Sequence, residues 1–185
     1  MKVHTGRGDD GTTGLFHGGR IRKDAPAPAA YGTVDETVAA LGMARAEATA
    51  VPTTAELALR LQKELFVVGA ELATAPENAA KLVDGESRVS AAMTAALAEL
   101  VASYEERLPE LREFVVPGAN RLSAALDMAR TVCRRAEREA ITAQAASPAA
   151  NPELLRYLNL LSDLLFLMAR DCEVDVTTVH DRSSR

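Results

Sequence analysis

The fold class is decided by the stretch YLNLLSDLLFLMAR, residues 157–170. A helix built from it carries apolar residues almost all round, so most of its surface has to be buried. At 100° per residue, Arg156, Asn159, Asp163 and Arg170 share one stripe about 60° wide. Buried polar groups need partners, so we interpret Asp163 and Arg170 as parts of an internal ion-pair network, with a further role open for Asn159.

Periodic apolar residues predict further helices on the N-terminal side of this stretch. Thr33 followed by Glu36 has the pattern of a capping box, which predicts that a helix begins at Thr33. We expect helices over residues 33–48, 54–75, 87–107, 120–146 and 152–172, with a loop at 77–85 and an extended stretch at 113–118. Five helices with short links predict an all-α, five-helix bundle.

The chain divides into three parts within one domain, residues 1–185. Residues 1–32 are rich in glycine and lack a helical period, so they form either a flexible tail or a loop that orders around a ligand. Residues 33–173 form the predicted bundle, and 174–185 a polar tail.

Composition narrows the class of protein. The 185 residues are 48% hydrophobic and 4% aromatic, with a formal charge of −5, which favours a helical globular domain and argues against a nucleic-acid partner. Cys133 and Cys172 are too few for a disulfide framework, so we expect reduced core thiols. No apolar run reaches membrane-spanning length and the N-terminus lacks an apolar signal segment, so we expect a soluble, cytoplasmic protein without membrane contact.

A glycine–hydroxyl segment, TGRGDDGTT at residues 5–13, is the first candidate for chemistry. Glycines let backbone N–H groups converge on one point and neighbouring hydroxyls add donors, which is how loops hold phosphate oxygens. The segment is not a Walker loop, because GxxxxGK[ST] is absent. Lys23 follows in a basic run and can add positive charge. A flexible N-terminus is the alternative.

An arginine stripe on the predicted fourth helix is the second candidate. Arg130, Arg134, Glu137 and Arg138 fall within about 100° of arc, while the apolar residues of the same helix lie mostly on the opposite side. The stripe is either a solvated face or a face that another subunit covers with a polyanion between them. Arginine suits the second role, because its fork binds phosphate bidentately and stays charged.

Other motifs are few. Phe114 precedes Val-Val-Pro-Gly on the extended stretch, where an aromatic residue is most often core. The histidines show no metal-ligand spacing, and neither Cys-x-x-Cys nor GxSxG occurs. The residues themselves therefore predict no metal centre and no nucleophilic hydrolase.

Seven stretches occur in the order seen in one family: GDDGTT at 8–13, GGRIRKD at 18–24, AYGTVDE at 30–36, LFxxGAELAT at 65–74, FVVPG at 114–118, ARTVCRRAER at 129–138 and YLNxLSDLLFxxAR at 157–170. On these motifs the chain resembles the PduO-type ATP:cob(I)alamin adenosyltransferases, from Thr5 to about Arg170. The resemblance implies a homotrimer of five-helix bundles with active sites between subunits.

The resemblance also implies site residues. Arg134, Phe114, Asp35 and Arg130 are the implied catalytic residues: Asp35 pairs with Arg130 across or beside the interface, and Phe114 lies against the lower face of the corrin. ATP, with Mg²⁺ on its triphosphate, is implied to contact Thr5, Gly8, Asp9, Gly11, Thr12, Thr13, Lys23, Arg134, Glu137, Arg138 and Asn159.

The implied reaction transfers the 5′-deoxyadenosyl group of ATP to cob(I)alamin or a related corrinoid. Cobalt(I) is the nucleophile and triphosphate leaves, so the protein supplies position and charge rather than a base. A hydrophobic wall that excludes the lower axial ligand makes cobalt(II) easier to reduce. A reductase and an adenosylcobalamin-dependent acceptor enzyme are the implied partners.

Four positions depart from the family pattern. Val38 replaces an asparagine or another small polar residue, and Ala119 replaces a glycine. Asp127 replaces a histidine, and Leu160 replaces an arginine. Val38 and Leu160 remove hydrogen-bonding capacity, so we expect ATP binding to persist and corrinoid handling to change. The alternative functions are a non-catalytic relative that binds ATP, a corrinoid or another tetrapyrrole as carrier or sensor, and a helical oligomerisation protein without a ligand.

Overall fold

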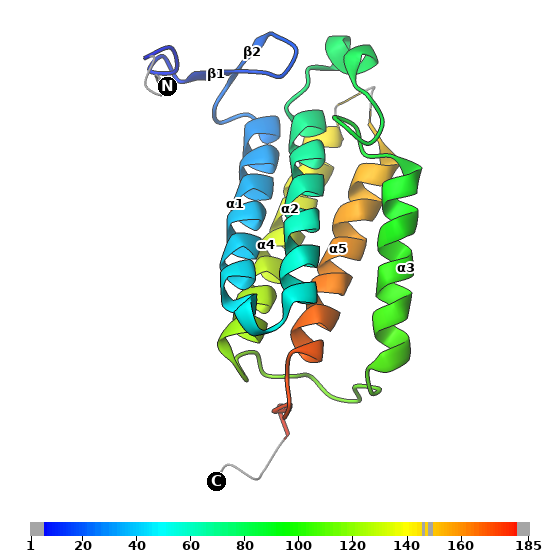
Figure 1. Ribbon diagram of the computed structural model, residues 1–185. Coiled ribbons are helices and arrows are strands. Elements are labelled where there is room, and N and C mark those ends of the chain that lie inside the picture. The colour runs from blue at the N-terminus through cyan, green and yellow to red at the C-terminus, as the bar shows by residue number, and fades with distance from the viewer. Residues whose placement is uncertain (1–5, 146, 148–149, 181–185) are drawn as a thin grey trace.

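The computed structural model describes residues 6–145, 147 and 150–180, and five α-helices form its body (Figure 1). They are α1 (Pro26–Glu47), α2 (Pro52–Leu72), α3 (Ala91–Arg107), α4 (Arg121–Gln144) and α5 (Pro152–Asp171). Two short 3-10 helices, η1 (Ala48–Ala50) and η2 (Pro76–Lys81), follow α1 and α2, and strands β1 (Thr12–Gly14) and β2 (Arg20–Arg22) precede α1. The predicted helical class is therefore confirmed, with a small two-stranded sheet added.

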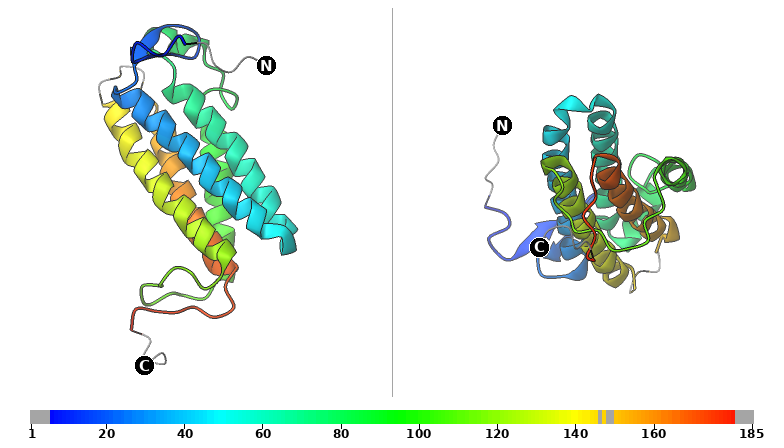
Figure 2. Two further views of the ribbon diagram at one scale, coloured as in Figure 1. Left: turned by 90° about the vertical axis from the view of Figure 1, so that its left-hand side faces the viewer. Right: turned by 90° about the horizontal axis from the view of Figure 1, so that it is seen from below.

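The helices stand side by side and alternate in direction along the chain (Figure 1). Helix α1 packs against α2 and α4, α4 packs against α5, and α3 packs against α5 (Figure 2). Helix α5 contributes seven large, fully buried side chains: Leu154, Tyr157, Leu158, Leu161, Leu164, Leu165 and Met168. The nearly all-apolar stretch thus lies in the core, as its sequence predicts.

The predicted capping box at Thr33 is wrong. Helix α1 begins at Pro26, and Thr33 is a buried residue inside it whose hydroxyl donates to the carbonyl of Ala29 at 2.9 Å. Proline suits the first turn, because its missing N–H is one that the helix leaves unpaired there. Pro52 and Pro152 begin α2 and α5 in the same way, so these prolines start helices rather than end them.

Polar residues cap the starts of α3 and α4. The start of α3 and the predicted loop at 77–85 both differ from the prediction. Ser90 accepts a hydrogen bond from the N–H of Met93 at 3.3 Å, so α3 begins at Ala91 and not at 87. Asn120 and Ser123 form a reciprocal capping box at the start of α4. The predicted loop at 77–85 is partly the 3-10 helix η2.

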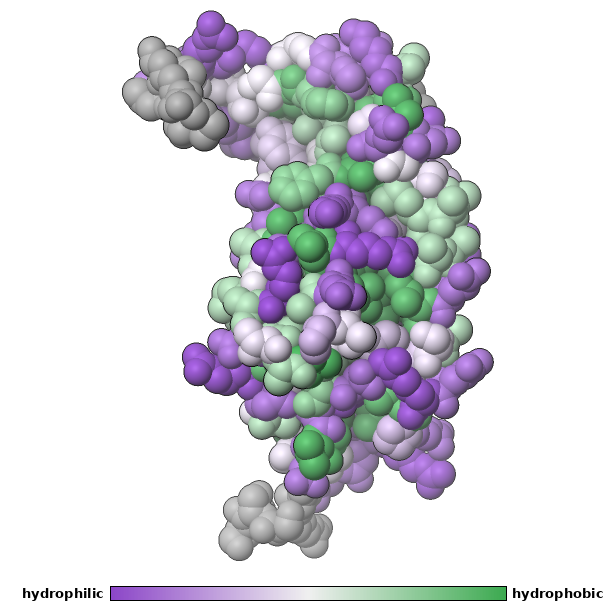
Figure 3. Space-filling model, viewed as in Figure 1, coloured by the Kyte–Doolittle hydropathy of each residue, from purple (hydrophilic) through white to green (hydrophobic). Residues whose placement is uncertain are grey.

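The N-terminal segment is a β-hairpin. Strands β1 and β2 pair antiparallel, with Thr13 opposite Ile21, and the hairpin docks on the end of α2 through the N–H of Phe16, which donates to the carbonyl of Ala73 at 2.9 Å. Figure 3 shows that this end is largely hydrophilic, whereas hydrophobic patches are spread over the bundle. The described part of the segment therefore contacts the bundle through its own backbone.

The C-terminal segment pairs with the link between α3 and α4 at the other end of the bundle. The N–H of Val116 donates to the carbonyl of Thr177 at 2.8 Å, and the N–H of Val179 donates to that of Phe114 at 3.0 Å. Asn120 fastens the same region by donating to the carbonyl of Cys172 at 2.7 Å. The predicted extended stretch is therefore present, and part of the predicted polar tail is its partner.

Candidate functional site

The loop before β1 is shaped by glycines in the left-handed region. Gly6 and Gly11 have φ values of +68° and +79°, which side chains rarely adopt. Two turns follow: the N–H of Asp9 donates to Gly6 and that of Gly11 donates to Gly8. The backbone from Gly6 to Gly11 thus bends twice within a few residues.

Threonine and basic side chains meet at this loop. Asp10 accepts from both the N–H and the hydroxyl of Thr12, at 2.9 and 2.7 Å, and these bonds lower the pKa of the Asp10 carboxyl. Arg20 donates to the Thr12 hydroxyl and to the carbonyl of Arg7. A Cβ atom at Gly8 would lie 3.0 Å from the ammonium of Lys23 and 3.3 Å from the carbonyl oxygen of Thr12, so the lysine side chain passes close to the backbone of the loop.

The structure therefore brings together most of the predicted loop residues: Gly8, Asp9, Gly11, Thr12, Thr13 and Lys23. Thr5, the remaining predicted loop residue, lies outside the described residues. Sequence reasoning missed Arg20 as the group that holds Thr12. The signal was available, because Arg20 opens the basic run that ends at Lys23.

The arginine stripe on α4 faces away from the core, as predicted. Arg134 and Arg138 are exposed, and a guanidinium nitrogen of Arg138 donates to the carbonyl of Arg134 at 3.0 Å. Glu137 is half-buried. On the other side of the helix, Leu126, Ala129 and Cys133 are fully buried.

A hollow of about 290 Å³ joins this stripe to α5. Its described lining residues come from α3, α4 and α5: Glu105, Arg130, Arg134, Ser162, Asp163, Phe166 and Leu167. Burial raises the pKa of Asp163, and the charge of Arg134 opposes that shift. Arg134 thus supplies positive charge to a partly apolar hollow.

Helix α5 is oriented by a buried tyrosine. Tyr157 is fully buried, and its hydroxyl donates to a carboxylate oxygen of Glu64 on α2 at 2.6 Å. Burial is the main reason that the pKa of Tyr157 is raised, so it stays a neutral donor. With that side of α5 fixed inward, Asn159 and Asp163 are exposed on the outer side.

A second, larger hollow of about 540 Å³ adjoins the first. It lies between the C-terminal ends of α3 and α5 and shares Glu105, Phe166 and Leu167 with the arginine-lined hollow. Its other lining residues are five apolar and four charged ones: Leu108, Pro109, Leu111, Val174, Val176, Glu110, Arg170, Asp171 and Glu173. Phe166 therefore forms a wall common to both hollows.

Exposed apolar side chains gather near this end of the bundle. Phe114 is 86% exposed and Val174 98%, with Val116 and Val179 exposed on the two paired segments. A core role for Phe114 is thus excluded within one chain. Several exposed apolar side chains at one end of a bundle are typical of a site for an apolar ligand or a partner.

Asp127 and Arg170 form a buried ion network beneath the hollows. Asp127 pairs with Arg170 at 2.5 Å and with Arg130 at 3.2 Å, and Arg170 also pairs with Glu173 at 2.8 Å. The predicted internal role of Arg170 is confirmed, but its partners are Asp127 and Glu173 rather than Asp163. Sequence reasoning missed this network, because Asp127 on α4 and Arg170 on α5 are 43 residues apart in the chain.

Asp35 lies apart from Arg130 within one chain. It is exposed on α1, beside a hollow of about 280 Å³ whose other walls include Phe16, Val38 and Phe66. Arg130 is instead held by Asp127. A pair between Asp35 and Arg130 stays a prediction about contact between two chains.

The departures from the family pattern are accommodated in the chain. Val38 and Leu160 pack partly buried against the core, and the carbonyl of Val38 accepts from the side-chain amide of Gln62 at 2.9 Å. Among described buried side-chain atoms, the other amide atom of Gln62, Oε1, is the one without a partner. This oxygen belongs to the side chain that bonds to the backbone of Val38.

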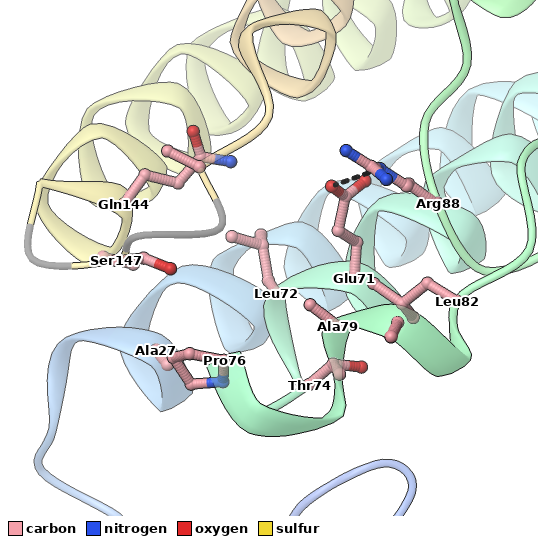
Figure 4. Close-up of a pocket in the computed structure, with 13 residues that line it drawn as sticks. Ala27, Glu71, Leu72, Thr74, Pro76, Ala79, Leu82, Arg88, Gln144 and Ser147 are labelled. Atoms are coloured by element: carbon pink, nitrogen blue, oxygen red, sulfur yellow. Dashed lines mark ion pairs between the residues drawn. The ribbon is translucent and has the colours of Figure 1, made fainter.

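A further hollow of about 390 Å³ lies at the hairpin end, between the ends of α2 and α4 (Figure 4). Glu71 and Arg88 point toward each other on one side of it, with Gln144 and Ser147 across from them. Glu71 accepts from the N–H of Val89 at 2.7 Å, and burial raises its pKa. The carboxylate therefore ties α2 to the start of α3.

Neither a metal-binding cluster nor a membrane-spanning helix occurs among the described residues. No group of three or more histidine, cysteine, aspartate or glutamate residues there is placed to hold a metal ion. None of the helices that the structure describes combines the length and the apolar character needed to cross a bilayer.

Comparison with known proteins gives consistent matches. The family model described as cobalamin adenosyltransferase matches residues 3–172. A corrinoid adenosyltransferase of Citrobacter freundii is 42% identical over 169 residues, which cover 91% of this chain and 93% of that protein. A corrinoid adenosyltransferase of Bacillus subtilis is 40% identical over 174 residues, covering 92% and 86%.

Solved structures agree with the sequence matches. A variant of the PduO-type ATP:corrinoid adenosyltransferase of Lactobacillus reuteri, complexed with cobalamin and ATP, superposes with a TM-score of 0.86 at 27% identity, covering 97% of this chain and 100% of that chain. Another variant of that enzyme, complexed with ATP, gives 0.81 at 29% identity, covering 91% and 93%. This chain therefore belongs to the cobalamin adenosyltransferase family, of the PduO type.

Proposed function

We propose that this protein transfers the 5′-deoxyadenosyl group of ATP to cob(I)alamin or a related reduced corrinoid and releases triphosphate. The observation that carries the proposal is the arrangement on α4 and α5: a hollow lined by Arg130 and Arg134 and a larger, mixed polar and apolar hollow share Phe166, in a chain of this family. The arginines of the first hollow suit an anion, and the larger hollow has room and apolar surface for part of a ring.

The nucleotide side is assigned to the hairpin loop and the arginine stripe. Backbone N–H groups of the glycine turns and the ammonium of Lys23 suit phosphate oxygens. Arg134 and Arg138 are exposed and add bidentate donors, with Glu137 and Asn159 beside them. Thr5, Gly8, Asp9, Gly11, Thr12 and Thr13 complete the proposed contacts.

We propose that Mg²⁺ binds together with the triphosphate of ATP. Mg²⁺ typically keeps several waters and takes one or two carboxylates together with substrate phosphates. The exposed carboxylate of Asp9 on the loop can supply one such ligand, and a full set of protein ligands is not required. When bound, the ion would neutralise the charge of the leaving triphosphate.

The chemistry requires positioning more than acid or base catalysis. Cobalt(I) attacks the 5′ carbon of ATP, the carbon–oxygen bond to triphosphate breaks, and the electron pair leaves with the triphosphate. The chain's own contribution is to hold the two substrates in line and to meet developing negative charge with Arg134 and Lys23. No protein group has to accept a proton in this step.

The corrinoid side is assigned to the apolar end of the bundle. Phe114 projects from a link that the C-terminal segment holds in place, and it is exposed enough to lie against a flat ring. An apolar surface there would exclude a lower axial ligand, which favours reduction of cobalt(II). Phe166 continues the same wall.

Assembly as a homotrimer is part of the proposal. Within one chain, the hairpin lies at one end of the bundle and the 113–118 link at the other (Figure 1). The described lining of the hollow beside Arg134 includes no hairpin residue. ATP that touches the loop and reaches a corrinoid at Phe114 would therefore do so between two chains, where Asp35 and Arg130 would pair.

Two measurements test the proposal. An anaerobic assay with ATP and chemically reduced cobalamin should give adenosylcobalamin and triphosphate. Binding of ATP without product under strong reduction would contradict it and favour the carrier or sensor. Light scattering at micromolar concentration should give the mass of three chains, and a stable monomer would contradict the shared site.

A further inference from the structure

The carboxylate of Asp127 connects two arginines that lie on different walls. Asp127 is 4% exposed on α4, one oxygen accepts from Nε of Arg130 at 3.2 Å, and the other accepts from Arg170 at 2.5 Å. A single charge therefore fixes two guanidinium groups. This aspartate stands where the family pattern usually has a histidine, so the connection is a property of this chain's own residues.

Within one chain, the four charges of the network sum to zero. Arg170 donates to both oxygens of Glu173, at 2.8 and 3.0 Å, and its side chain is 3% exposed. Arg130 is the most exposed member, at 26%, against 5% for Asp127. Within one chain, loss of the charge on Asp127 would leave one positive charge in excess, and Arg130 is the member exposed enough to turn away from Asp127.

Both arginines shape the hollows, although Asp127 lines neither. Arg130 lines the hollow beside Arg134. The guanidinium of Arg170 stacks 5.0 Å from the ring centre of Phe166, and Phe166 lines both hollows. Asp127 can thus act on the site only through these neighbours.

We infer that Asp127 is a positioning residue for the reaction: it fixes Arg130 directly and Phe166 through Arg170, and so sets the wall between the nucleotide and corrinoid hollows. The inference rests on the proposed function for the identity of the two ligands. The geometry of the network itself is independent of that assignment.

The test is Asp127→Asn, which keeps the side chain's size and removes its charge. We expect the KM for cob(I)alamin to rise about tenfold, because the wall loses a charged hydrogen-bond partner, while the KM for ATP changes less than about twofold. Asp127→Glu, which restores the charge, should recover part of the loss. Glu71→Gln is the matched control, since Glu71 is similarly buried at the other end of the bundle.

Calorimetric titration with ATP and with cob(II)alamin measures the affinity for each ligand without turnover. It therefore tests the role of Asp127 separately from the proposed reaction. If the wild type binds both ligands without turnover, the proposed reaction is contradicted. A selective loss of corrinoid affinity in Asp127→Asn would still support the positioning role. If Asp127→Asn fails to fold, Glu173→Gln loosens Arg170 from its other side and should show the same selective loss. Unchanged or equally reduced affinities for both ligands in the folded variant would overturn the inference, as would a wild type that binds no corrinoid.

Discussion

The hairpin end and the α4–α5 end hold their polar side chains in opposite ways. At the hairpin, Arg20, Asp10 and Thr12 bond to one another while largely exposed, on a backbone bent at glycines. At the other end, Asp127 and Arg170 are buried and fully paired. Exposed pairs contribute little to stability and rearrange easily, whereas breaking a buried pair leaves an uncompensated charge. One end is thus suited to closing around a mobile phosphate chain and the other to a fixed wall.

The largest expected effect tests this contrast in stability. Arg170→Ala should lower the free energy of unfolding by about 3–5 kcal/mol, because Asp127 and Glu173 would remain buried without their partner. Arg20→Ala should cost less than about 1 kcal/mol, because its contacts are exposed. Urea denaturation of the two variants measures both, and equal losses would refute the contrast.

The next effect concerns ligand binding on the arginine stripe. Arg134→Ala should weaken ATP binding about a hundredfold, because a charge-assisted bidentate contact is lost. Arg135→Ala is the matched control on the same helix, since Arg135 pairs with Glu36 of α1. Calorimetry that shows the same ATP affinity for both variants would remove Arg134 from the site.

A smaller effect, expected at Phe114, distinguishes the corrinoid side of the site from the ATP side. Phe114→Ala should lower adenosylation that starts from cobalt(II) and a reductant about tenfold or more, while ATP affinity stays within about twofold. The fold should be unaffected, because the side chain is 86% exposed and removing it opens no core cavity. A parallel loss of ATP affinity would show that Phe114 is not confined to the corrinoid side.

The smallest effect is a pH dependence at the hairpin end. Burial raises the pKa of Glu71, so the folded protein binds its proton more tightly than the unfolded chain does. Stability from this group is therefore greatest below the unfolded pKa and falls as pH rises through the raised folded pKa. Urea midpoints measured from pH 4 to 7 should fall less with pH in Glu71→Gln than in the wild type, and identical slopes would contradict the shift.

Local pattern predicted the helices well where burial decided them. The nearly all-apolar stretch at 157–170 had to lie in the core, because no surface could accommodate leucines on every side. The arginine stripe likewise had to face outward, since the opposite side of α4 is apolar. These features depend on periodicity along one segment, which the sequence contains in full.

Starts of helices were predicted less well. Thr33 and Glu36 match a capping box, yet α1 continues back to Pro26, and Thr33 satisfies its hydroxyl at Ala29. A threonine can bond backward inside a helix as readily as it can cap one, so the motif is ambiguous without its surroundings. The proline rule for first turns gives the correct start for α1, α2 and α5.

By itself, the sequence determined the helical class, the burial of α5 and the outward arginines, because each follows from spacing or composition within a segment, and its seven ordered motifs indicated the family. Only the tertiary structure decided which charges meet. Asp127, Arg170 and Glu173 form one network, Phe166 becomes a wall of two hollows, and the C-terminal segment supports Phe114. These contacts depend on how α4, α5 and the links are placed in space. The strength of a charge interaction depends on the distance between the groups, so a carboxylate pairs with the cation that lies nearest in space rather than in the chain.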